Sequence, residues 1–221
     1  HPAMLARQAL TIDHISSGRL EIGLGTGINI DPSYDMMGIP NWDGKERVPR
    51  FKEYVEVIDG LLSKEVSSFS GEYFTINEAV VKPRPVQQPR PPIVIAALGP
   101  VMVRFAARMA DTWNTMSFAG TFDEQLAEIG AKVDVFNGAC ARLGRDPGAV
   151  RLSYHMFDPT ARSSGGAFSY YASVDAFEEM AGRVMEAGFG ELSLYYPVLP
   201  EQVSVFERIA QDVLPKIRQA A

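Results

Sequence analysis

The chain has 221 residues, of which 46% are hydrophobic and 22% charged, and its formal net charge is −6. This is ordinary globular composition, and it predicts a single domain over residues 1–221. The sequence has no basic block of the kind that would predict binding to nucleic acid. It also has no apolar run that approaches the roughly 20 residues needed to cross a bilayer. The one cysteine, Cys140, lies on an apolar helical stripe. We therefore expect a cytoplasmic protein with a buried thiol, no disulfide framework and no metal site.

Apolar periodicity predicts alternating helices and strands in the first part of the chain. Apolar residues at three- and four-residue steps favour helices, and short continuous apolar runs favour buried strands. The predictions are a helix over 1–15, a strand over 20–25, a functional or mobile loop, a helix over 45–62, and a hairpin from runs 66–69 and 73–76. The hairpin and the proline-rich connector after it form an excursion from the domain over residues 64–91.

The stretch from Pro92 to Asn114 predicts one strand–turn–helix–strand unit. Its parts are a buried strand over 93–97, the turn Leu98-Gly99-Pro100, a helix over 101–110 and the start of a strand over 112–116. Pro100 suits the first helical position. The turn presents unpaired backbone N–H groups and the positive end of the helix, so it is a candidate anion site. A purely structural turn is the alternative interpretation.

The second half of the chain continues the alternation. The predictions are a helix over 121–143 with a Thr121/Glu124 capping box, a strand over 150–157, a candidate lid over 158–173, a helix over 175–187 capped by Asp175 and Glu178, a strand over 191–196, and a last helix that Pro215 kinks. Strict alternation predicts an α/β fold with five parallel strands and helices outside. An open doubly wound sheet and part of a (β/α)₈ barrel both fit.

The strand ends where a ligand would bind are rich in glycine, small and aromatic residues. We find no carboxylate pair, no nucleophile with its base and no metal cluster in the pattern, which predicts that a bound cofactor carries the reaction. His155 is interpreted as a packed or rim residue, and Trp42 and Trp113 as core or rim aromatics rather than stacking platforms. The segment 20–27, with Glu21 in it, is similar to the first motif of S-adenosylmethionine methyltransferases, and its glycines are also similar to a dinucleotide fingerprint that lacks the third glycine.

Four blocks carry a more specific resemblance. They are residues 1–27, 50–54, 70–74 with 82–87, and 92–114, where Ala106-Ala107-Arg108-Met109-Ala110-Asp111-Thr112-Trp113-Asn114 is the most specific part. In this order and spacing the chain resembles the luciferase-like monooxygenase family, the bacterial-luciferase-type flavin and deazaflavin oxidoreductases.

This resemblance implies a TIM barrel, the (β/α)₈ fold, that binds FMN or coenzyme F-420 at its strand ends and acts on a small organic substrate. It implies that Gly25, Thr26 and Gly27 lie against the cofactor ring or ribityl chain. The cofactor phosphate would be held by the turn of Ala96, Ala97, Leu98, Gly99, Pro100 and Val101. The alternatives are a methyltransferase and a non-catalytic truncated barrel that dimerises. The pattern assigns no catalytic residue.

The incomplete barrel raises one further expectation. Five strands and a small hairpin insertion cannot close a barrel of eight. Open sheet edges and an apolar interior facing water are a liability that proteins avoid. We therefore expect the sequence to be part of a longer chain, with pairing to a second copy as the alternative and a homodimer as the expected assembly.

Overall fold

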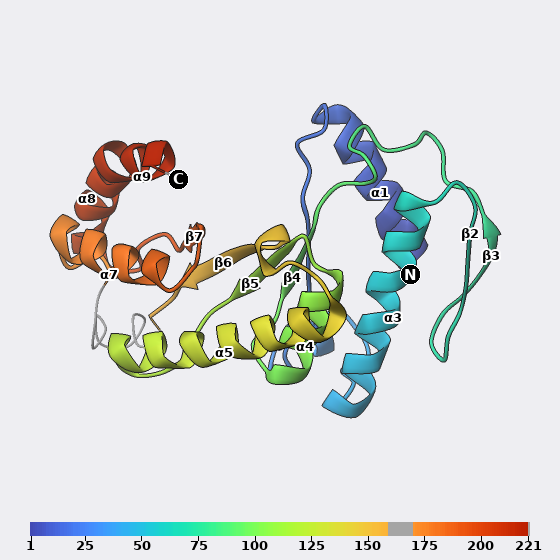
Figure 1. Cartoon of the computed structure of the whole chain (residues 1–221), viewed down its shortest axis with the longest axis horizontal. Helices are drawn as coiled ribbons and strands as arrows, with labels where there is room; N and C mark the ends of the chain where they lie inside the picture. Colours follow the sequence, from blue (N-terminus) through green and yellow to red (C-terminus); the bar gives the residue numbers. More distant parts are fainter. Residues whose placement is uncertain (159–169, 221) are drawn as a thin grey trace. The chain divides into compact units, whose positions relative to one another are not determined.

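The structure is a computed structural model that describes residues 1–158 and 170–220. They form two compact units, His1–Ala96 with Met109–Asp111 and Ala97–Arg108 with Thr112–Ala221, and Figure 1 shows their elements in sequence colours. The prediction of one domain over 1–221 stays a prediction. The candidate lid over 158–173 falls largely on residues 159–169, outside the described part. No described helix is both long and apolar enough to traverse a lipid bilayer.

The first unit pairs two parallel strands and carries two long helices and a hairpin. Its elements are α1 (Pro2–Ile15), β1 (Ile22–Gly25), α2 (Ser33–Met36), α3 (Gly44–Ser63), β2 (Ser67–Ser70), β3 (Thr75–Ala79) and β4 (Ile93–Ala96). The predicted helices, strands and hairpin are confirmed, and the long loop gains the short helix α2. Helices α1 and α3 lie side by side (Figure 1). Strand β1 pairs with β4 so that Gly25 is opposite Ala96, which brings both carboxyl ends to one level.

A buried carboxylate joins α1 to the proline-rich connector. Asp13 is fully buried. Its Oδ2 accepts hydrogen bonds from the backbone N–H of Val86 at 2.7 Å and of Gln87 at 3.3 Å, and its Oδ1 accepts one from Gln87 Nε2 at 2.9 Å. The same Gln87 amide donates to the Leu20 carbonyl at 2.7 Å. Because a buried charge is stable only when it is hydrogen-bonded, this cluster fixes the connector against α1.

A second ionic cluster fixes the start of β4. Arg90 Nε donates to Asp59 Oδ1 of α3 at 2.6 Å, and its Nη1 donates to Asp111 Oδ2 at 2.5 Å. The Asp111 carboxylate also accepts the backbone N–H of Ile93 at 2.7 Å. Burial alone lowers the pKa of Arg90, but hydrogen bonds to the two carboxylates outweigh it and the pKa is raised. Arg90 therefore stays charged and holds α3, the connector and β4 together.

The second unit holds three parallel strands with helices between them. Its elements are α4 (Pro100–Met109), β5 (Thr112–Thr115), α5 (Phe122–Leu143), η1 (Pro147–Ala149), β6 (Arg151–Met156), α7 (Val174–Glu186), β7 (Glu191–Leu194), α8 (Pro200–Arg208), η2 (Ile209–Val213) and α9 (Leu214–Ala220). Strand β6 pairs in parallel with both β5 and β7. With β1 and β4, the described residues contain the five strands that the sequence predicts. The fully buried Trp113 ring stacks on Phe136 with centroids 4.9 Å apart.

The helix ends agree with the sequence except at α7. Thr121 and Glu124 form the predicted capping box of α5. The predicted cap of α7 by Asp175 and Glu178 is wrong, because Ser173 directly precedes the helix in an extended conformation and its side chain accepts the N–H of Ala176 at 3.0 Å. Asp175 lies in the first turn instead.

The predicted disturbance at Pro215 takes the form of a widened turn. The π-helical segment Ile209–Val213 separates α8 from α9, and Pro215 lies in the first turn of α9. Proline lacks the N–H of a continuous helix, and its ring clashes with the carbonyl four residues earlier. The wider π turn lies where that carbonyl would be, so it accommodates the ring.

The Asp13 cluster generates a stability prediction. We expect Asp13→Ala to lower the free energy of unfolding by about 3 kcal/mol, because it removes a fully buried carboxylate and leaves the N–H groups of Val86 and Gln87 without their acceptor. Urea unfolding followed by tryptophan fluorescence measures the loss. Asp134→Ala, at an exposed position of α5, is the control and should change stability by less than about 0.5 kcal/mol. Equal losses in the two variants would contradict the structural role of Asp13.

Candidate functional site

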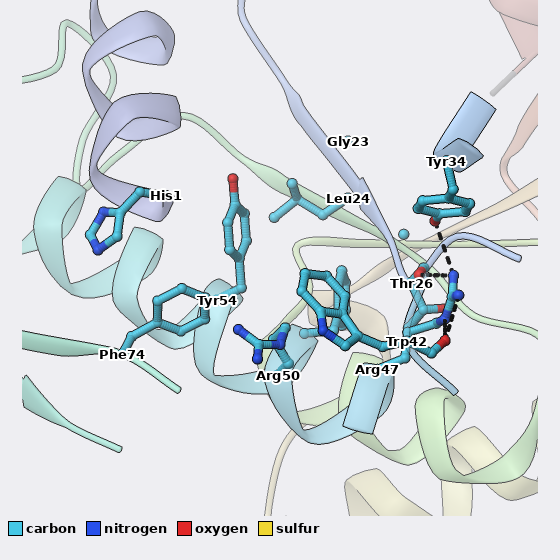
Figure 2. Close-up of a pocket in the computed structure, with 12 residues that line it drawn as sticks. His1, Gly23, Leu24, Thr26, Tyr34, Trp42, Arg47, Arg50, Tyr54 and Phe74 are labelled. Carbon is cyan, nitrogen blue, oxygen red and sulfur yellow. Dashed lines mark hydrogen bonds between the residues drawn. The ribbon is translucent and has the colours of Figure 1, made fainter. Parts of the chain in front are cut away.

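A cavity of about 640 Å³ lies at the carboxyl end of β1, and Figure 2 shows the side chains around it. Its walls combine the end of the strand, aromatic rings and basic side chains. They are Gly23, Leu24, Gly25 and Thr26; Tyr34, Trp42, Phe51, Tyr54 and Phe74; and His1, Arg47 and Arg50. All of them belong to the first unit. Since the walls carry no carboxylate, the cavity suits a ligand with aromatic surface and hydrogen-bond acceptors.

The predicted site residues of the first unit are Gly25, Thr26, Gly27 and Ala96, and each has a different place relative to the cavity. Gly25 and Thr26 line the cavity, and Ala96 is the neighbour of Gly25 on β4. Gly27 follows with a φ of +70°, and a Cβ there would lie 2.2 Å from the Tyr34 hydroxyl. Only glycine permits both this backbone conformation and this close approach. Gly27 therefore lets the loop after β1 close over the strand end.

Arg47 holds that loop in place. Its Nε donates to the Trp42 carbonyl at 3.0 Å, and its Nη1 donates to the Tyr34 hydroxyl at 3.0 Å and to the Thr26 carbonyl at 3.4 Å. Its Nη2 donates to the Asn41 side chain and, at 2.7 Å, to Trp42 again. The guanidinium thus joins both ends of the loop, and its donors are engaged by the protein itself.

Arg50, one turn further along α3, is held by rings instead. Its guanidinium carbon lies 4.2 Å from the Trp42 ring centroid and 4.5 Å from that of Tyr73. Its Nη2 donates to Glu46 Oε1 at 2.7 Å. Its Nε is buried and makes no hydrogen bond. Cation–π contacts with two rings hold the guanidinium without using its N–H groups.

Glu53 attaches the hairpin tip to α3. Its carboxylate accepts the backbone N–H groups of Glu72 at 2.8 Å, Tyr73 at 2.9 Å and Phe74 at 3.1 Å. Burial raises the pKa of Glu53, but these bonds and the nearby Arg50 charge outweigh it, so the pKa is lowered. A Cβ at Gly71 would lie 2.3 Å from a Glu53 oxygen, so the tip also requires glycine. Phe74 thereby reaches the cavity, where its ring meets Tyr54 edge to face.

The predicted phosphate turn lies at the start of α4 in the second unit. The Ala97 N–H donates to the Asn114 carbonyl at 2.9 Å and its carbonyl accepts Trp113 Nε1 at 3.0 Å, so Ala97 positions the turn and has no N–H to offer a ligand. The residues that follow, Leu98, Gly99, Pro100 and Val101, are exposed. Pro100 is the first helical residue, as predicted. The first N–H groups of a helix lack intrahelical acceptors, which leaves this end open to an anion.

His155 and Cys140, which the sequence predicts to be packed or rim side chains, are half-buried and buried respectively. The Nδ1 of His155 is 3.0 Å from Ser193 Oγ, and its ring stacks on Phe157. Burial lowers the pKa of His155, so the ring is neutral at pH 7. Cys140 is a buried free thiol whose pKa is raised by burial.

Residues 1–191 match the family model described as luciferase-like monooxygenase. The chain belongs to the luciferase-like monooxygenase family. It is 33% identical to pyrimidine monooxygenase RutA of Cronobacter sakazakii over 77% of this chain and 49% of RutA. It is 27% identical to an F420-dependent glucose-6-phosphate dehydrogenase of Beutenbergia cavernae over 99% of this chain and 74% of that protein. The chain thus spans about half the length of the pyrimidine monooxygenases that it matches.

The structural likeness shows the fold. An F420-dependent secondary alcohol dehydrogenase, solved with an F420-acetone adduct, superposes with a TM-score of 0.78 at 17% identity, covering 99% of this chain and 76% of that one. The fold is the TIM barrel of the luciferase-like family, and the described residues supply five of its parallel strands. The methyltransferase and dinucleotide interpretations are superseded. Those folds need a helix directly after the glycine turn, whereas α2 begins only at Ser33 and has 4 residues.

Sequence reasoning included Arg50 and Glu53 in a family block without giving them a role, and it missed Arg47. One signal was available for Arg47. It lies four residues before Phe51, on the face of α3 that the apolar stripe buries. A charge on a buried stripe must find partners, so it indicates a built site. Nothing in the sequence reveals that Trp42 and Tyr73 enclose Arg50, since the two rings belong to different loops.

The Gly27 geometry generates a prediction with a matched control. Gly27 and Gly38 both have positive φ, but a Cβ at Gly38 would meet no atom within 4 Å. We expect Gly38→Ala to cost about 1 kcal/mol of backbone strain. Gly27→Ala should cost at least about 2 kcal/mol more, because its methyl group displaces Tyr34. Urea unfolding measures both. Adding Tyr34→Phe should restore part of the loss only in the Gly27 variant, and equal losses in the two alanine variants would refute the close approach.

Glu53 generates a pH prediction. Its folded-state pKa lies below the ordinary value of 4.5. The ionised carboxylate therefore contributes stability above about pH 4.5, and this contribution disappears as the pH falls through the lowered pKa. We expect Glu53→Gln to be less stable than the parent at pH 7, with the difference shrinking below pH 4.5. Thermal unfolding across this range checks the sign, and exposed Glu65→Gln is the control. A difference that grows on acidification would contradict the proposed contacts.

Proposed function

We propose that this chain belongs to a flavin- or deazaflavin-dependent oxidoreductase that acts on a small organic molecule, with FMN or coenzyme F-420 as its cofactor. Family membership supports this, as do the names of relatives that are monooxygenases or F420-dependent dehydrogenases. The observation that carries the proposal is the cavity at the end of β1, which has bare backbone on one side and aromatic rings on the others. It offers few groups for acid–base chemistry, as expected where a cofactor carries the reaction.

The residues present fit such a cofactor. A Cβ at Gly23 would meet no atom within 4 Å, and one at Gly25 would approach only Ala96. The strand end therefore presents backbone without side chains, which leaves room for a flat ring to approach closely. The exposed start of α4 offers N–H donors and a positive helix end for a phosphate.

We assign the cofactor contacts on this basis. Gly25, Thr26 and Gly27 would bind the ring or ribityl chain. Ala96 continues into the exposed turn, where the N–H groups of Leu98, Gly99 and Val101 would bind phosphate; Ala97 and Pro100 would shape that turn. When bound, the flavin or deazaflavin supplies hydride transfer, and a flavin in its reduced form also supplies oxygen activation. The protein binds and orients the reactants and excludes water, which the rings of Trp42, Tyr54 and Phe74 serve by surrounding the cavity.

We also propose that the protein works in the cytoplasm as a homodimer. A single buried cysteine suits a reducing compartment. Five strands leave sheet edges that a second copy or further chain would cover. Sedimentation velocity tests the assembly directly, and a monomer at all concentrations would contradict it.

The phosphate turn generates a binding prediction. Gly99→Asp places a negative charge at the start of α4 without a steric conflict, because a Cβ there meets open space. We expect it to weaken FMN binding at least tenfold and to leave riboflavin, which lacks the phosphate, nearly unchanged. Gly99→Asn, of the same size but neutral, is the control.

Titration followed by visible absorbance measures these affinities, and F-420 is tested in parallel. Equal weakening of FMN and riboflavin by Gly99→Asp would contradict the placement of the phosphate. Failure of both FMN and F-420 to bind the parent protein would refute the proposed function.

A further inference from the structure

One arginine in the wall of the cavity of the first unit has N–H donors that make no hydrogen bond to the described residues. Arg47 and Arg50 both line the cavity. Arg47 donates from all three nitrogens to the loop after β1. Within the described part of the chain, Arg50 donates a single hydrogen bond, from Nη2 to Glu46, and its Nε is buried without an acceptor. Of the two arginines, Arg50 is therefore the one with N–H groups to offer a ligand.

The orientation of these N–H groups is fixed. The Trp42 and Tyr73 rings lie 4.2 and 4.5 Å from the guanidinium carbon. Figure 2 shows Arg50 between Tyr54 and Trp42 in the view into the cavity. A guanidinium donates only in its own plane, in a fork that matches the two oxygens of a carboxylate. Because two ring contacts and the hydrogen bond to Glu46 hold the guanidinium, its fork is in position before a ligand arrives.

The nearby acids do not compete for this position. Glu46 already binds Nη2 of Arg50, and the Glu53 oxygens are occupied by three backbone N–H groups of the hairpin tip. Neither carboxylate lines the cavity. A ligand in the cavity thus meets donors and no acidic side chain, which disfavours cations.

The remaining walls select for a flat ring. Tyr54 and Phe74 meet edge to face with centroids 5.9 Å apart, and Trp42 and Phe51 also line the cavity. Aromatic side chains bind aromatic rings by stacked or edge-to-face contact. A volume of about 640 Å³ holds a small organic molecule.

We propose that the part of this cavity beside Arg50 is the substrate pocket, next to the strand end where the cofactor ring would bind. It takes an aromatic carboxylate, with Arg50 binding the carboxylate group and the aromatic walls binding the substrate ring. This assignment rests on the proposed function, because the proposed cofactor residues Gly25 and Thr26 line the same cavity.

Calorimetric titration with benzoate and with its neutral analogue benzamide tests the assignment. The parent protein should bind benzoate at least tenfold more tightly than benzamide. Arg50→Gln should reduce this ratio to less than twofold, whereas Arg50→Lys, which keeps the charge but loses the planar fork, should give an intermediate ratio. Cyclohexanecarboxylate should bind more weakly than benzoate because it is not flat. Equal affinity for benzoate and benzamide in the parent protein, or an unchanged ratio in Arg50→Gln, would overturn the assignment.

Two controls separate binding from folding and locate the ligand. Arg142→Gln removes an exposed arginine of α5 and should leave the ratio unchanged. Thermal unfolding of each variant identifies one that fails to fold, and Arg50→Lys then decides the test. Benzoate should also quench tryptophan emission in the parent protein but not in Trp42→Phe, since Trp113 is fully buried. Quenching that persists in Trp42→Phe would overturn the location.

Cofactor titrations keep the two proposals distinguishable. Benzoate binding that depends on Arg50, without binding of FMN or F-420, would refute the proposed function and leave the aromatic-acid site standing. Cofactor binding without discrimination between benzoate and benzamide would refute only the aromatic-acid site. Competition between FMN and benzoate would overturn the assignment of the Arg50 side of the cavity to the substrate, because the cofactor would then occupy that side as well.

Discussion

Buried charge is the constraint on which the first unit depends. A charged side chain leaves water only when hydrogen bonds replace its hydration, and these partners must come from segments that the chain brings together. Asp13 takes its donors from the connector, Glu53 from the hairpin tip, and Arg90 binds carboxylates of α3 and of the segment before β5. Each charge therefore fixes one irregular segment that periodic apolar packing could not fix.

Two of these charges link widely spaced blocks of this sequence, the blocks that carry its resemblance to the family. The block 1–27 supplies Asp13, and the block 82–87 supplies the amides that surround it. The block 50–54 supplies Glu53, and the block 70–74 supplies the three N–H groups that it accepts. The loss of a carboxylate in one block would leave N–H groups of the other block without their acceptor, so hydrogen bonding joins the paired blocks in this chain.

Periodicity predicted the elements because burial alone sets them. The stripe through Phe51, Val55 and Ile58 is buried along α3 as its three- and four-residue spacing indicates. The cap of α7 was mistaken by two residues, because Ser173 and Asp175 are both good caps and only the backbone conformation distinguishes them. Parallel pairing also follows from the alternation, and it places Gly25 opposite Ala96.

The cavity walls were beyond sequence reasoning for a physical reason. Trp42, Arg50 and Phe74 come from a loop, a helix and a hairpin, and no periodic pattern relates positions in such segments. The sequence does contain two residues that depart from the regular apolar pattern. They are Gly27, which has a positive φ, and Arg47, which lies on the buried face of α3.

Those exceptions are connected. Gly27 leaves the space into which Tyr34 and Arg47 fit, and Arg47 then holds the loop carrying Trp42. Trp42 in turn is one of the two rings that hold the Arg50 guanidinium. A single residue without a side chain thus determines, through two arginines, which donors face the cavity. The backbone conformation that only glycine adopts readily at position 27 and the donors offered by Arg50 are thus two ends of one chain of contacts.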